Sequence, residues 1–183
     1  MAFGRADQSG ANSFDRRATQ PSMILNRQRR VRVSVRDLKE FVSRARHALR
    51  LPATSVTVCL VTNSEIARWN REYRGKSAAT DVLSFPAGEP LRRPGGSGAR
   101  KKADSFSPVL FATPDSPAPY LGDIAIAPEV ARRNARRLGR PFAQEMRILI
   151  LHGMLHLMGY DHETDAGEMD RRERRLRRAL GLG

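Results

Sequence analysis

Cysteine is almost absent from this sequence, which has a single one, Cys59, in 183 residues. One thiol excludes an intrachain disulfide framework and any cysteine-rich zinc site. Cys59 lies in the apolar run of residues 56–61, which predicts a small buried side chain. The sequence also lacks a run of about 20 apolar residues, the length that crosses a bilayer. It lacks the apolar segment of a secretion signal near its start. These absences predict a cytoplasmic protein without a membrane partner.

Acidic residues are scarce relative to basic ones. The sequence has 33 Lys and Arg against 19 Asp and Glu, a net charge of +14 at pH 7. Such an excess attracts polyanions, and RNA is the commonest polyanion inside a cell. The alternatives are a basic surface that serves solubility alone and an anionic membrane surface bound through a basic amphipathic helix.

Composition divides the chain into three regions. The length predicts one domain with a sizeable core. Residues 1–22 are polar and aperiodic, which predicts a disordered N-terminal extension to a domain of residues 23–183; Met23 is an alternative natural start. Residues 87–119 combine many prolines and glycines with a basic cluster at 100–102, and structureless segments of that length are uncommon in compact domains. We expect a flexible basic insertion there, either an arm that contacts RNA or a neutral insertion.

Hydrophobic periodicity predicts alternating strands and helices. The expected strands are 23–28 (or to 33), 55–61, 80–85 ended by Pro86, and 121–127. The expected helices are 35–49, a second one capped by Asn63 or Ser64, 128–138, 141–158 and 165–180. Helix 141–158 is apolar nearly all round, which is typical of a central buried helix.

Two of these helices carry rows of arginines. In helix 128–138, Leu138 belongs to the apolar stripe, and the other side carries Arg132, Arg133, Arg136 and Arg137, with Arg140 just beyond. In helix 165–180 the arginines between 171 and 178 are expected to face outward. Such rows are usually solvated faces, and contact with RNA is the equal alternative here.

Three of the four histidines fall within twelve residues. His152 and His156 are four apart on the central helix, so both rings project from one face. Gly159 lets the chain leave the helix with positive φ, and the following turn can bring His162 over the same face. Three imidazoles hold zinc at about 2.0–2.1 Å and leave a fourth position for water or substrate. The pattern predicts one zinc ion per chain on His152, His156 and His162, whereas His47 is expected at the surface.

The residue after the first histidine bears on the chemistry. Zinc lowers the pKa of bound water to about 7 and polarises phosphoryl oxygens, and both effects favour phosphodiester cleavage. Metallopeptidases with paired helical histidines carry a glutamate directly after the first one as general base. Here that position is Gly153, which makes a peptidase the less favoured alternative.

Acidic side chains could support the metal ligands. Metal-bound imidazoles usually donate their second N–H to a carboxylate or carbonyl, and Asp81, Asp123 and Asp161 are candidates for this role. Each could equally be a turn or strand-end residue. Glu145, seven residues before His152, is a weaker candidate for handling a catalytic water.

Residues 152–162 resemble the signature of the YbeY family of bacterial endoribonucleases, also called rRNA maturation factors. Further similarity lies in Asn-Arg-Glu-Tyr-Arg-Gly-Lys at 70–76, Thr-Asp-Val-Leu-Ser-Phe-Pro at 80–86 and Leu-Gly-Asp-Ile at 121–124. The resemblance covers about residues 23–182, with 87–119 outside the shared pattern.

The resemblance implies a single-domain α+β fold, with a small mixed sheet, about five helices and zinc held by the three histidines at the end of a central helix. It implies a zinc-dependent, single-strand-specific endoribonuclease that matures the 3′ end of small-subunit 16S rRNA and acts in ribosome quality control. The implied partners are ribosomal RNA and the small subunit or its assembly factors, with no DNA expected. Arg74 matches the family's functional arginine, and a guanidinium binds phosphate through two parallel hydrogen bonds. Taken alone, Arg74 could equally be a surface charge after a helix. The alternative is a ribosome-assembly factor that binds RNA and uses zinc structurally.

Overall fold

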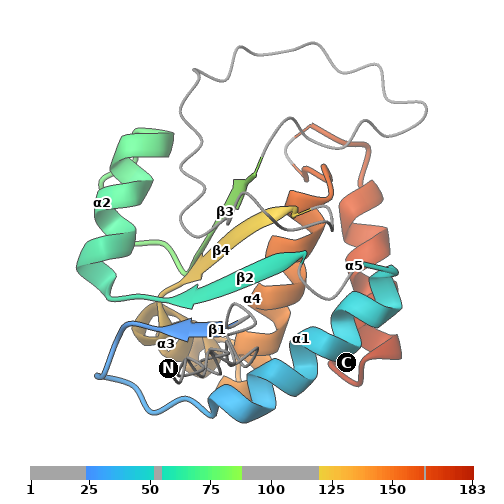
Figure 1. Cartoon of the computed structure of the whole chain (residues 1–183), viewed down its shortest axis with the longest axis horizontal. Coiled ribbons are helices and arrows are strands. Elements are labelled where there is room, and N and C mark those ends of the chain that lie inside the picture. Colours follow the sequence, from blue (N-terminus) through green and yellow to red (C-terminus); the bar gives the residue numbers. More distant parts are fainter. Residues whose placement is uncertain (1–23, 52–54, 88–119, 163) are drawn as a thin grey trace, which may run out of the picture.

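A four-stranded sheet with helices on both faces forms the body of the protein in the computed structural model (Figure 1). The structure describes residues 24–51, 55–87, 120–162 and 164–183. The strands are β1 (Ile24–Asn26), β2 (Val56–Leu60), β3 (Val82–Pro86) and β4 (Gly122–Ile126). The helices are α1 (Val35–Leu49), α2 (Asn63–Arg74), α3 (Pro128–Arg137), α4 (Phe142–Leu157) and α5 (Glu168–Ala179). The predicted α+β fold with a small mixed sheet is confirmed, whereas the expected extension 1–22 and nearly all of the insertion 87–119 lie outside the described residues.

The sheet has the strand order β1-β2-β4-β3. β1, β2 and β4 run parallel, and β3 pairs antiparallel with β4 at one edge. All five residues of β2 are buried because both faces of the sheet are covered. Val58 joins the core on the side of α1, α4 and α5, and Cys59 joins the core on the side of α2, where it is buried as predicted.

The central helix of the fold is α4, as the sequence predicts. Figure 1 shows it beside the sheet, between the sheet and α5. Leu151, Met154 and Leu155 have no solvent exposure, because the sheet, α1 and α5 surround them. Within the described residues no helix has the length and apolar character needed to cross a membrane. The last turn of α4 and the loop after it lie at one end of this packed body.

Two strand boundaries differ from the predictions. β1 ends at Asn26, because the buried side chain of Gln28 bonds both backbone groups of Val31 at 2.9 Å and turns the chain. β3 begins at Val82 and includes Pro86, which was expected to stop it. An edge strand tolerates proline because the missing N–H need not belong to a ladder.

The cap of α2 is Thr62, so the prediction of Asn63 or Ser64 was wrong. The Thr62 hydroxyl accepts a hydrogen bond from the Glu65 amide at 3.3 Å, and the Glu65 carboxylate accepts one from the Thr62 amide at 2.9 Å. This reciprocal pair satisfies two amides that the first turn leaves without helical partners.

Two helix ends also differ from expectation. α5 begins at Glu168 rather than Asp165, because the Asp165 carboxylate accepts hydrogen bonds from the three amides of residues 167–169. α3 ends at Arg137, and Leu138 is 49% exposed instead of belonging to the apolar stripe.

Candidate metal centre

The last two turns of α4 bring two imidazoles together. The Nε2 atoms of His152 and His156 lie 3.1 Å apart. Gly159 takes a φ of 84° just after the helix, so the chain turns back as predicted. One ligand nitrogen from each of His152, His156 and His162 then lies within 4.8 Å of the others. The structure therefore assembles the three histidines that the sequence singled out.

The spacing of these nitrogens fits a metal ion. Tetrahedral zinc with bonds of 2.0–2.1 Å separates its ligand nitrogens by about 3.3 Å, close to the spacing of His152 and His156. Imidazole is a preferred ligand of zinc and of several other transition metals. Burial lowers the pKa of His156, and the nearby His152 and His162 lower it further. The neutral ring, which is the form that binds metal, is therefore favoured.

The carboxylate that supports this site is Glu173 of α5, which sequence reasoning missed. Its Oε2 lies 3.0 Å from Nδ1 of His152, and Arg177 donates to its Oε1. Burial raises the pKa of Glu173, but the hydrogen bonds and charges of His152 and Arg177 outweigh burial, so the pKa lies below its usual value. A carboxylate at Nδ1 keeps the proton there and leaves Nε2 free to bind a metal.

A sequence signal for Glu173 did exist. It falls on the stripe of α5 that also holds Met169, Leu176 and Leu180, and it is 6% exposed. A carboxylate on the buried stripe of a helix is costly unless it is paired. Arg177, which was expected to face outward, is half-buried against it.

A cleft of about 730 Å³ opens over the three histidines. Arg74, the last residue of α2, lines it, and so do residues of β3 and of the loop that follows α4. The full lining is Arg74, Lys76, Thr80, Asp81, Val82, Leu83, Ser84, Pro86, His152, His156, Gly159, Tyr160, Asp161, His162 and Thr164. The cleft therefore joins all four predicted site residues, although Arg74 lies 78 positions before His152.

Comparison with known proteins identifies the family. The family model described as Endoribonuclease YbeY matches residues 23–181. The chain belongs to the YbeY family. It is 38% identical to the endoribonuclease YbeY of Koribacter versatilis, over 87% of this chain and 86% of that protein. It is 41% identical to the protein of the same name from Anaeromyxobacter sp., over 74% of this chain and 59% of that longer protein.

A solved structure supports the fold of this YbeY-family chain. The solution structure of a Thermotoga maritima protein matches with a TM-score of 0.51 and 26% sequence identity. The match covers 86% of this chain and 87% of that one. A third relative, the endoribonuclease YbeY of Sulfurovum sp., is 35% identical over 74% of this chain and 78% of its own length.

Gly153 has a structural role in this YbeY-family chain that also bears on the peptidase alternative. A Cβ atom at this position would lie 2.7 Å from the Ile124 side chain of β4. The residue after the first histidine therefore faces the sheet, while His152 and His156 line the cleft. A glutamate side chain at this position would meet Ile124 of the sheet, so this position is not built to supply the general base of a peptidase.

The three aspartates proposed to support the ligands have different surroundings. Asp81 lines the cleft. Its carboxylate accepts hydrogen bonds from the Asn134 side chain of α3 at 2.9 Å and from the Val82 amide at 3.0 Å, and it thereby links α3 to the start of β3. Asp161 also lines the cleft, and its charge raises the pKa of His156 against the larger lowering effects. Asp123 is fully buried, accepts a hydrogen bond from the Tyr120 hydroxyl at 2.6 Å and is not part of the described cleft lining.

Glu145 does not fit the role of handling a catalytic water. It lies in the first turn of α4, about 10 Å along the helix from His152. It is buried, pairs with Arg140 at 3.3 Å and is not part of the described cleft lining. Its position therefore does not support the predicted catalytic role.

Proposed function

We propose that the histidine cleft is where this endoribonuclease cuts RNA, that its metal is zinc and that its substrate is single-stranded. The observation that carries the proposal is the convergence of three imidazoles and Arg74 on one cleft in a chain of the YbeY family. The cleft volume falls in the range of about 300–1,000 Å³ that is usual for small-molecule pockets. A hollow of that size suits part of one strand rather than a double helix.

The proposed mechanism gives the residues in and around the cleft separate roles. His152, His156 and His162 would hold the metal, and Glu173 keeps His152 in the tautomer that this requires. When bound, zinc would lower the pKa of a water molecule and offset negative charge that develops on the phosphate. Arg74 would hold the scissile phosphate by two charge-assisted hydrogen bonds.

Elemental analysis tests the metal assignment. Protein purified without chelator should carry about one zinc per chain, and His156→Ala should lose both the zinc and the cleavage of single-stranded RNA. A folded wild type that neither retains nor takes up zinc would contradict the assignment. Zinc binding without any RNA cleavage would instead favour an assembly factor with a structural metal.

The role of Arg74 is tested against a neighbouring arginine. Arg74→Ala should lower RNA cleavage by about 10- to 100-fold, because a hydrogen bond to a charged group contributes roughly 1.5–3 kcal/mol. Arg71→Ala is the control, since Arg71 is exposed on the same helix and is not part of the described cleft lining. Equal rates for the two variants would remove Arg74 from the proposed mechanism.

We also propose that the RNA is the 3′ region of 16S rRNA precursors, and that the enzyme works in the cytoplasm with the small ribosomal subunit or its assembly factors. The family membership and the net charge of +14 support this. Cells that lack the protein should accumulate 16S precursors with unprocessed 3′ ends, detected by mapping RNA ends. Normal ends in such cells would argue against this substrate.

A further inference from the structure

A second hollow adjoins the histidine cleft. It measures about 260 Å³ and is lined by Tyr160, Glu168, Arg171, Arg172 and Arg175; we call it the α5 groove. Tyr160 also lines the histidine cleft, so one residue borders both hollows. A polymer that leaves the cleft past Tyr160 would therefore enter the α5 groove.

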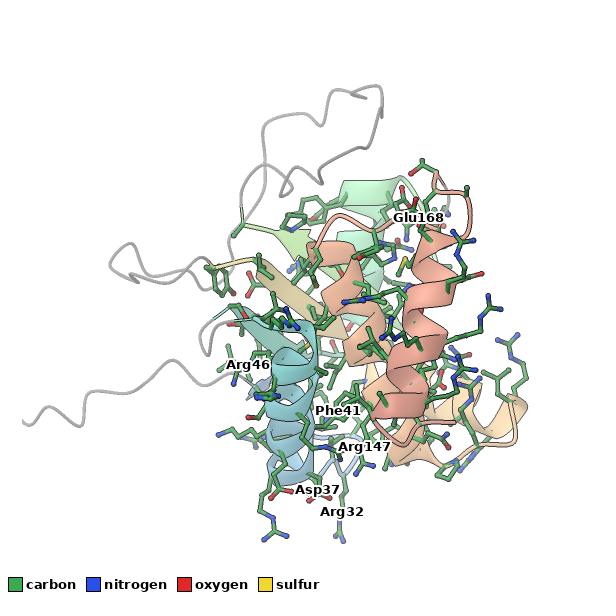
Figure 2. All side chains as sticks on the ribbon, turned by 90° about the vertical axis from the view of Figure 1, so that its right-hand side faces the viewer. Arg32, Asp37, Phe41, Arg46, Arg147 and Glu168 are labelled. Carbon is green, nitrogen blue, oxygen red and sulfur yellow. The ribbon has the colours of Figure 1, made fainter. Side chains whose placement is uncertain are left out.

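The groove is basic because of the way α5 is packed. Met169, Glu173 and Leu176 are buried, so this face of the helix is the one docked onto the protein. Positions 168, 171, 172 and 175 follow helical spacing along another face. Arg171 and Arg175 are exposed, and three guanidinium groups outnumber the single carboxylate of Glu168. Figure 2 labels Glu168 at the start of α5, next to the loop that follows α4.

The second arginine-rich helix, α3, is placed differently. Arg132 of α3 lies over the ring of Phe142, 5.3 Å from its centroid, at the first residue of α4. Phe142 lies fourteen positions before His156, which is about 21 Å along the helix. Arg140, beyond α3, is paired with Glu145. Of the two arginine rows found in the sequence, the one on α5 lines a hollow that shares Tyr160 with the cleft, whereas no arginine of α3 is part of the described lining of either hollow.

We propose that the α5 groove binds the backbone phosphates of the RNA strand where it extends beyond the cleft. The inference rests on the proposed function and names a surface for the same substrate. Arg171 and Arg175 are one helical turn apart, about 6 Å, and offer charge along the helix. Guanidinium groups bind phosphate without reading sequence, so the groove would add affinity for longer RNA and little selectivity for bases.

The test compares two pairs of arginines on the same helix. Arg171→Gln/Arg175→Gln removes two charges from the groove, and Arg174→Gln/Arg178→Gln removes two from exposed positions outside its described lining. The zinc-loaded enzymes are assayed on a single-stranded RNA of ~20 nucleotides and on a tetranucleotide, lengths that bracket common site sizes.

The groove pair should raise KM for the longer RNA about tenfold and leave kcat unchanged, and the control pair should raise it less than twofold. The dependence of log KM on log salt should become shallower by about 1.4, since each lost phosphate contact contributes about 0.7 for a single strand. Neither pair should alter KM for the tetranucleotide. All four positions are exposed, and the bond that Arg171 donates to the Ala166 carbonyl at 3.0 Å is exposed too, so unfolding midpoints should stay close to the wild type.

Equal changes in KM for both pairs would overturn the inference, because net charge rather than the groove would then be responsible. An equal rise in KM for the tetranucleotide would also overturn the inference, because these arginines would then bind RNA within the cleft. An unchanged KM for the groove pair would overturn the inference as well. An acidic protein would then be the partner to test for the α5 groove. Arg175→Gln alone, with an expected threefold rise in KM, replaces the pair if the pair does not fold. A wild type that cuts neither RNA would contradict the proposed function itself, and the inference with it.

Discussion

At the scale of single residues, Glu173 sets which nitrogen of His152 faces the cleft. Its carboxylate occupies Nδ1, and Arg177 holds the other carboxylate oxygen. The ring therefore has its proton on the side away from the metal position, and Nε2 is 3.1 Å from its counterpart on His156. In the proposed mechanism Glu173 is therefore a positioning residue, which would act on the reaction through His152.

Replacing Glu173 should weaken metal binding. Glu173→Gln keeps the shape of the side chain but loses its charge, and zinc affinity should fall about tenfold, at the low end of the 10- to 100-fold effects seen for such partners. Competition with a chromophoric chelator measures this. Asp170→Asn, an exposed carboxylate on the same helix, is the control and should bind zinc as the wild type does. Equal affinities for the two variants would contradict the positioning role.

The three histidines were predictable because their proximity is local. Two lie one turn apart on a helix, and a glycine brings the third back six residues later. Glu173 was missed because its contact with His152 spans 21 positions and depends on how α5 packs against α4. Asp81 and Asp161 line the cleft, but the carboxylate that contacts Nδ1 of His152 is that of Glu173. Hydrophobic patterns do not state which carboxylate reaches an imidazole, so the predicted supporting role of the three aspartates stays a prediction.

At the scale of elements, Gly153 sets how closely α4 approaches the sheet. Gly153→Ala places a methyl group against Ile124, and overpacking of this kind costs about 1–3 kcal/mol in the free energy of unfolding. Urea denaturation measures the loss. The double variant with Ile124→Ala should lose less than the sum of the two single changes, because alanine lacks the γ and δ carbons that the added methyl group would meet. If the losses in the free energy of unfolding of the two single variants simply add in the double variant, the contact is not strained.

The capping box of α2 predicts a pH-dependent stability. Burial raises the pKa of Glu65, but the hydrogen bonds from Thr62 and the charges of Arg27 and Arg68 outweigh burial, and the pKa falls below its usual 4.5. The charged carboxylate therefore stabilises the fold above the pKa of the unfolded chain, and this stabilisation is lost as the pH falls through the folded pKa. Glu65→Gln should lower the thermal midpoint by a few degrees at pH 7 and by less at pH 3.

A control for this prediction lies on the same helix. Glu72 is exposed and 3.9 Å from Arg68. Glu72→Gln should change the midpoint less than Glu65→Gln does at pH 7, because exposed pairs contribute little. A difference between wild type and Glu65→Gln that stays constant from pH 7 to pH 3 would contradict the assignment.

Periodicity predicted where the elements lie better than where they end. β2 and β4 were each predicted one residue too long at both ends, and α1 was predicted with its observed bounds. The errors at Thr62 and Asp165 arose because several Ser, Thr, Asn and Asp residues lie near each helix start. The choice among them depends on side-chain geometry that the sequence does not contain.

At the scale of the whole molecule, the metal centre connects two helices. His152 and His156 belong to α4, His162 to the following loop, and Glu173 brings in α5. Zinc at 100 times its dissociation constant should therefore stabilise the protein by about 2.7 kcal/mol, which raises the midpoint by roughly 5–10 °C. Calorimetry with and without zinc measures this, and His156→Ala should show a much smaller rise. The same rise in both proteins would place the binding elsewhere.

The arrangement of the strands could not be derived from local patterns. The buried runs at β2 and β4 indicated central strands, but the pairing β1-β2-β4-β3 joins segments far apart in the sequence. The same holds for Arg74, which shares a cleft with the histidines because β3 lies beside β4 and packs against α4. The resemblance to the YbeY family implied the fold class and the role of Arg74, which residue patterns alone did not.

The antiparallel pairing of β3 with β4 has a consequence for how this enzyme can vary. The amide of Ala87 donates to the carbonyl of Leu121 at 2.9 Å, so the chain departs and returns at one point. Closing a loop there costs only about 0.6 kcal/mol more for each doubling of its length. Pro86, at the same point, lines the cleft. Insertions and deletions at this junction can therefore remodel the entrance to the histidine cleft and leave the packed sheet and helices unchanged, so the shape of the cleft can evolve here almost independently of folding.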